Sequence, residues 1–222
     1  MNELRTITAT TEASALVTNK VLRNTYLLLG CTLAFSALTA YLALTFQMPR
    51  MNILVMLGGY FGLLFGTMKT RESAWGLLFV FLLTGFLGLT LGPVLDFYLR
   101  ARANGGEIVM LALGTTAVTF LGLSAYAVIS RRDFSFMGGF LTVGLIAAFV
   151  LSLVAYFFNF PTLSLAVSGM FVLLSSGIIL YQTGEIVNGG ETNYIVATVT
   201  LYVSIYNLFV SLLQLFGAAG DD

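Results

Sequence analysis

Long apolar runs, each about 20 residues in length, recur along the whole chain and are separated by short polar links. A run of this length crosses the hydrocarbon core of a bilayer as a helix and is too long for a transmembrane strand. Only 9% of the residues are charged, whereas a soluble domain carries about 25%. The sequence therefore predicts an all-α, polytopic membrane protein.

Seven spans are expected within one transmembrane domain that covers residues 20–217. Residues 1–19 are polar and too weakly apolar for a signal peptide, so a flexible cytoplasmic tail is expected there, and 218–222 form a short C-terminal tail. The Gly92–Pro93 step predicts a kink or an early end in the third span. The spans are expected at 26–44, 53–68, 74–97, 108–129, 134–158, 163–181 and 189–216.

The distribution of Lys and Arg predicts the orientation, because cytoplasmic links carry the excess of these residues. One side holds Arg5, Lys20, Arg23, Lys69, Arg71, Arg131 and Arg132, and the other holds Arg50, Arg100 and Arg102. The N-terminus is therefore expected in the cytoplasm, with the protein in a bacterial inner membrane. The link between the sixth and seventh spans has only Glu185 and Glu191 as charges. The side of the C-terminus stays open, because a re-entrant seventh segment would return it to the cytoplasm.

A line of polar side chains runs along the last apolar segment. The spacings are four, three, four and three, so these residues share one helical face: Thr200, Ser204, Asn207, Ser211 and Gln214. Lipid offers an amide no hydrogen-bond partner, so this face should turn inward, with the seventh helix central to the bundle. The line either holds helices together or takes part in conduction, and both alternatives remain open.

Few other polar groups lie deep in the spans. Gln182 lies late in the sixth span, at a depth that differs from that of Ser204 by about 12 Å if both helices are straight. Asp96 and Glu185 are read either as interfacial residues or as gating acids. In the second span Gly58, Gly62 and Gly66 form a ridge that would let a neighbouring backbone approach closely.

The composition excludes most catalytic chemistry. Histidine is absent, which removes the usual general base and zinc ligand, and the lone Cys31 can form neither an intrachain disulfide nor a cysteine metal site. No phosphate-binding glycine loop follows a strand. We therefore expect neither an enzyme nor a cofactor, and the net charge of zero gives no reason to expect nucleic-acid binding.

Three stretches carry a family resemblance: GFLGLTLGP (85–93), LYQTGEIVNGGETNYI (180–195) and TLYVSIYNLFVSLL (200–213). With the order of the spans, they resemble the Bax inhibitor-1 (TMBIM) family, most closely its bacterial YccA-like branch. The resemblance implies six helices around a central seventh. It also implies a calcium-leak device in some members, built on two aspartates that share a proton. Those positions fall on Gln182 and Ser204 here, so both acids are missing and neither replacement titrates near neutral pH.

The branch also implies a link to FtsH, a membrane-anchored protease, as its modulator or substrate. Two functions of different classes follow. The first is a regulator that binds the FtsH complex in membrane-protein quality control, and the second is a leak pathway for calcium or protons. A passive structural membrane protein is the third reading. Loss of the acid pair favours the regulator over the channel.

Overall fold

The computed structural model describes residues 2–101 and 103–219, with side chains described for 18–100 and 103–219. Met1, Arg102 and 220–222 lie outside the described residues, and with them most of the predicted C-terminal tail. Within the described residues the chain forms α1 (Asn2–Thr45), α2 (Ile53–Thr70), α3 (Ala74–Ala101), α4 (Gly105–Ser130), the short 3₁₀ helix η1 (Ser135–Met137), α5 (Gly138–Phe157), α6 (Pro161–Val187) and α7 (Tyr194–Ala219).

All seven α-helices are long and apolar enough to cross a membrane, which confirms the predicted fold class. Several boundaries differ from expectation, and α7 begins at Tyr194, not at residue 189, because residues 188–193 form the link after α6. The third helix continues through Pro93 to Ala101, so the early end expected there is wrong; a proline is tolerated inside membrane helices where neighbouring groups satisfy the freed carbonyl. The stretch predicted as a tail is helical, because α1 begins at Asn2, whereas its apolar span begins at Thr18. Its flexibility stays a prediction.

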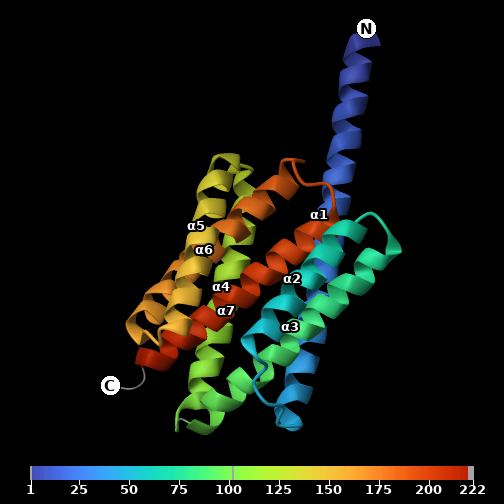
Figure 1. The fold of residues 1–222 in the computed structure, drawn as a ribbon. Helices are drawn as coiled ribbons and strands as arrows, with labels where there is room; N and C mark the ends of the chain where they lie inside the picture. Colours follow the sequence, from blue (N-terminus) through green and yellow to red (C-terminus); the bar gives the residue numbers. More distant parts are fainter. Residues whose placement is uncertain (1, 102, 220–222) are drawn as a thin grey trace.

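The seventh helix lies at the centre of the bundle, as the polar line predicted (Figure 1). In its most apolar window 61% of the residues are buried, against 6% in α2. The helices α1, α3, α4 and α6 pack directly on α7. The two others form an outer layer, since α2 packs chiefly on α3 and α5 chiefly on α6. The implied arrangement of six helices around one is therefore refined to four helices around one with two outside.

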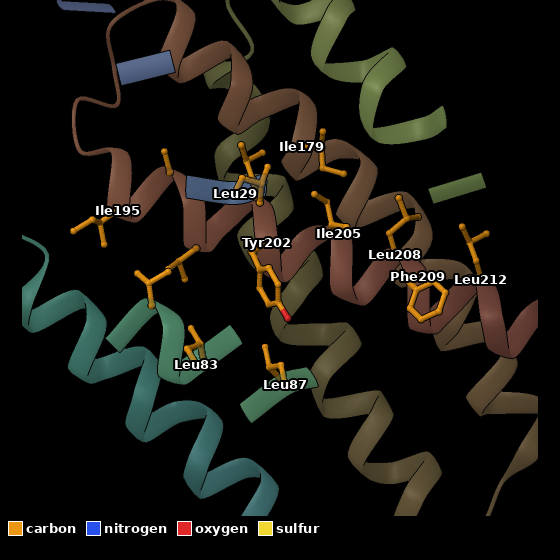
Figure 2. Close-up of a cluster of buried hydrophobic side chains, with 14 of the residues drawn as sticks. Leu29, Leu83, Leu87, Ile179, Ile195, Tyr202, Ile205, Leu208, Phe209 and Leu212 are labelled. Atoms are coloured by element: carbon orange, nitrogen blue, oxygen red, sulfur yellow. The ribbon is translucent and has the colours of Figure 1, made fainter. Parts of the chain in front are cut away.

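The core between these helices is apolar and continuous. Figure 2 shows the central part, where Leu29, Leu83 and Ile179 surround the middle of α7. Leu201 and Leu208 of α7 are fully buried within it. A separate, smaller cluster joins α5 to α6. Burial of each large aliphatic side chain stabilises the packing by dispersion contacts, because lipid tails are as apolar as the core. The outer helix α5 thus has a core of its own.

The packing of α1 against α3 depends on glycine. A methyl group on Gly88 would collide with the Ser36 carbonyl and the Thr39 hydroxyl, and one on Gly92 would collide with Ala43. By contrast, a methyl group on Gly58 or Gly62 would meet nothing within 4 Å. The glycine ridge predicted on α2 is therefore wrong for these two positions, and the small residues that permit backbone contact lie on α3.

The link between α6 and α7 is held in a defined conformation. Gly189 has φ +79°, and Gly190 N–H donates to the Glu185 carbonyl at 2.8 Å, which ends α6 in a Schellman motif. Asn193 then caps α7, because its Oδ1 accepts from Ile195 N–H at 2.9 Å. Its Nδ2 donates to the Arg71 carbonyl at 3.1 Å, which joins this link to the one between α2 and α3. The start of the central helix is fixed by these contacts.

Candidate functional site: the polar seam between α6 and α7

The five predicted residues of the polar line all lie on shielded parts of α7. Ser204 and Ser211 are buried, and Thr200, Asn207 and Gln214 are half-buried. None of the five is exposed. Lipid is a poor environment for hydroxyl and amide groups, so this placement is the one that their chemistry favours.

The last residue of the polar line, Gln214, is hydrogen-bonded to α6. Gln214 Nε2 donates to Ser164 Oγ at 2.6 Å, and Ser168 Oγ donates to Gln214 Oε1 at 2.8 Å. Both serines are one turn apart on α6, so a single amide joins both. Sequence reasoning missed them. The four-residue spacing of Ser164 and Ser168 was the available signal. We call the row of polar groups on the facing sides of α6 and α7 the polar seam. Its members are Ser164, Ser168, Ser175 and Gln182 of α6 with Ser204 and Gln214 of α7.

The bonds to Gln214 set the register of the two antiparallel helices. A step of ten residues back along α7 reaches Ser204, and the same step forward on α6 reaches the turn that holds Ser175. Gln182 lies two further turns along α6, level with Thr198. For straight helices Gln182 and Ser204 therefore differ in depth by about 9 Å. The two positions that the resemblance pairs do not lie at one level.

Their hydrogen bonds agree with this register. Ser204 Oγ donates to the Thr200 carbonyl of its own helix at 2.8 Å. Gln182 is 6% exposed, and its Nε2 atom has no hydrogen-bond partner among the described residues. The same holds for Ser175 Oγ. A buried donor without a partner costs about 1–3 kcal/mol. The end of the polar seam at Gln182 and Ser175 therefore has unsatisfied donors, whereas the end at Gln214 is fully paired.

A second polar layer lies on the opposite side of α7, and sequence reasoning missed it. Tyr202 Oη lies 2.5 Å from Ser36 Oγ of α1 and donates to the Thr84 carbonyl of α3 at 3.2 Å. One turn later Tyr206 Oη lies 3.0 Å from Thr90 Oγ1 of α3. The signal was the four-residue spacing of two tyrosines in an apolar helix, whose hydroxyls need partners when buried.

The two acids proposed as gates lie outside the polar seam. Asp96 lies near the end of α3 and pairs with Arg100 Nε at 2.5 Å, four residues along the same helix. Glu185 is half-buried at the end of α6, beside Gly190. Whether these acids act at the interface or as gates stays a prediction.

The centre of the described bundle carries no charge. Its buried polar side chains are serines, threonines and one glutamine, and no Asp, Glu, Lys or Arg is buried among the described residues. No group of three His, Cys, Asp or Glu side chains in the described part could hold a metal ion. The arrangement can form hydrogen bonds between helices and can bind neutral polar groups.

Gln214 offers a test of the paired outer end. In a double-mutant cycle of Gln214→Leu with Ser168→Ala, we expect a coupling of about 0.6 kcal/mol, the average for hydrogen bonds between membrane helices, and at most about 1.7 kcal/mol. Unfolding in mixed micelles monitored by circular dichroism measures it. Ser152→Ala is the matched control, because Ser152 Oγ bonds only within its own helix. Coupling equal to that of Gln214→Leu with Ser152→Ala would contradict the contact.

Known proteins match this chain over nearly all of its length. The family model described as "Inhibitor of apoptosis-promoting Bax1" matches residues 18–221. An uncharacterized protein of Pseudomonas aeruginosa is 54% identical over 202 residues, which are 91% of this chain and 90% of the relative. The Escherichia coli protein named "Modulator of FtsH protease YccA" is 48% identical over 209 residues, 94% of each chain. These matches show that the chain belongs to the Bax inhibitor-1 family of membrane proteins, as a homologue of YccA.

Proposed function

We propose that this protein binds an FtsH-type protease in the bacterial inner membrane and modulates its activity, with its own N-terminus in the cytoplasm. The observation that carries the proposal is the well-packed, charge-free centre of the bundle, in a chain 48% identical to a modulator of FtsH. A helix bundle with such a centre can act on another membrane protein by binding it.

Reconstitution tests the modulator directly. The purified protease and the full chain are placed together in vesicles, and degradation of a membrane substrate is followed by gel densitometry. We expect the degradation rate to change at least about twofold at equimolar protein, since binding that occupies half the protease has an effect of this size. An unrelated seven-helix protein at the same density is the control. An unchanged rate with both proteins inserted would refute the proposal.

A second candidate function is a leak pathway for calcium or protons. The leak function is supported by two donors of the polar seam, Gln182 Nε2 and Ser175 Oγ, which are buried without partners among the described residues. Polar groups that lack partners inside a bundle are typical of ion paths as well as of packing compromises. The lack of a nearby fixed charge disfavours cation entry, because a cation that leaves water needs compensation.

The leak function predicts a calcium flux that is nearly independent of pH. Any calcium flux into vesicles should vary less than about twofold between pH 6 and 8, because neither Gln182 nor Ser204 titrates in this range. Fluorescence of a trapped calcium indicator measures it. The Gln182→Asp, Ser204→Asp double variant is the comparison, and a pH response in that variant alone fits the missing acid pair. A steep response in the unchanged protein, removed by Gln182→Ala or Ser204→Ala, would contradict it.

A further inference from the structure

Three polar groups near one end of the bundle are buried and have no hydrogen-bond partner among the described residues. The groups are Thr25 Oγ1 of α1, Ser124 Oγ of α4 and Gln182 Nε2 of α6. The residues that carry them are at most 6% exposed. Buried polar groups in folded proteins are nearly always hydrogen-bonded, either to protein or to ordered water. These three groups therefore need partners that the surrounding helices do not supply.

Two of the three groups lie at the same depth on neighbouring helices. Asn188 Nδ2 donates to the Arg132 carbonyl at 3.1 Å, which joins the end of α6 to the link that follows α4. Gln182 lies five residues before the end of α6, and Ser124 lies six residues before the end of α4. Each is therefore about 8–9 Å from the joined ends. The helices α4 and α6 also pack directly on each other.

Contacts of α1 place the third group at this depth. Thr198 of α7, which is level with Gln182, donates from its Oγ1 atom to the Thr25 carbonyl at 3.3 Å. The next residue of α1, Tyr26, has its hydroxyl 3.4 Å from Thr183 Oγ1, beside Gln182 on α6. The three unpartnered groups thus share one level of the bundle. We call them the donor layer: Thr25, Ser124 and Gln182.

The hydroxyls of the donor layer do not use the acceptor that their own helix offers. A serine or threonine inside a helix can donate to the carbonyl four residues back. Thr116 of α4 does so, with its Oγ1 atom 2.7 Å from the Ala112 carbonyl. Two turns later on the same helix, Ser124 Oγ makes no such bond, and neither does Thr25 Oγ1 of α1. Both hydroxyls can therefore bond to a group that lies between the helices.

The surroundings of the donor layer favour a small neutral ligand. Ile179 and Ile186 lie one turn to either side of Gln182 on α6, and both are 0% exposed. No charged side chain is buried in the described part of the chain, so an ion would have no counter-charge. The hydroxyls of Tyr26 and Thr183 can accept as well as donate. A water molecule matches this set of groups, because it accepts from the donors and donates to the hydroxyls.

We propose that the donor layer is an internal water-binding site that joins α1, α4 and α6. Buried water molecules typically make about three hydrogen bonds to groups that otherwise lack partners. Bound water links these helices at this level, as the side chain of Gln214 links α6 to α7 at the other end of the polar seam. Water held there satisfies Gln182 without a path for ions. The site is therefore independent of both the modulator and the leak function.

X-ray footprinting of the full chain in lipid nanodiscs tests the site. The beam converts water into hydroxyl radicals, which oxidise the side chains beside it, so bound water labels residues that bulk solvent cannot reach. Mass spectrometry then gives the extent of oxidation at each residue. We expect Ile179 and Ile186 to be oxidised at least about fivefold more than Leu208 of α7, which is also 0% exposed but lies in the apolar core. Equal oxidation at the three residues would overturn the proposal.

Variants show whether the donor layer itself holds the water. The double variant Ser124→Ala, Gln182→Leu should lower the oxidation of Ile186 to that of Leu208, and Ser124→Ala alone should lower it at least about twofold. Ser152→Ala is the matched control, because Ser152 Oγ bonds only within its own helix, and it should change nothing. Oxidation of Ile186 that persists in the double variant would overturn the proposal. Size-exclusion chromatography, with the elution volume of the unchanged protein, shows that each variant is folded.

Discussion

Replacing Gly88 by valine should prevent the protein from reaching its folded state. The glycine lies where α3 meets α1, and an added side chain would run into the Ser36 carbonyl and the Thr39 hydroxyl. A backbone atom cannot rotate away as a side chain does, so α1 and α3 would have to separate. Overpacking in a core costs about 1–3 kcal/mol, and more where the backbone must move. Separation would also disturb Ser36, whose hydroxyl contacts Tyr202 of the central helix.

The measurement is the fraction of detergent-extracted protein that elutes as a single species, together with its thermal midpoint. We expect Gly88→Val to lower the monodisperse fraction at least about fivefold, with Gly88→Ala intermediate. Gly62→Val is the matched control, because a Cβ atom there meets nothing within 4 Å, and it should leave both quantities nearly unchanged. Equal loss in the two valine variants would show that the effect is a general one of β-branched residues in these helices.

This pair of glycines also shows what the sequence could predict about the fold. The number of spans and the central place of the last helix follow from the length of the apolar runs and from the polar line. Which helix faces which cannot be read in the same way, since Gly62 and Gly88 both belong to glycine-rich rows. In lipid a small residue on an outer face costs little, so the row alone does not show where backbones meet.

The same distinction between one helix and the contacts between helices applies to the site. Gln214 and Ser204 were predicted from their spacing on one helix, which is a local property. Their partners depend on the register between helices, and the register is set by side chains far apart in sequence, such as Ser168 and Gln214. The layer around Tyr202 joins α1, α3 and α7, so no single helix shows it. The pairing of Gln182 with Ser204 came from family resemblance, and the register does not place them at one level.

Deleting residues 2–12 should lengthen the lifetime of this protein severalfold in cells that contain the protease. A processive protease must grip a segment outside the membrane before it can pull, and the apolar span of α1 begins only at Thr18. Figure 1 shows the N-terminal part of α1 projecting beyond the other helices. With the N-terminus in the cytoplasm, as the Lys and Arg distribution predicts, this segment is the one that the protease can reach.

Controls must show that a longer lifetime comes from the loss of residues 2–12 themselves and not from a shorter chain or from failed membrane insertion. Replacing the helical residues 2–12 by a Gly/Ser segment of equal length supplies an unstructured grip, so that variant should be degraded at least as fast as the unchanged protein. Pulse-chase labelling measures both lifetimes, and protease protection of the α2–α3 link measures insertion. If the shortened and full-length proteins decay at one rate, the N-terminal segment is not the grip. If the Gly/Ser variant is long-lived as well, the protease recognises the sequence of residues 2–12, and a segment of this length outside the membrane is not sufficient.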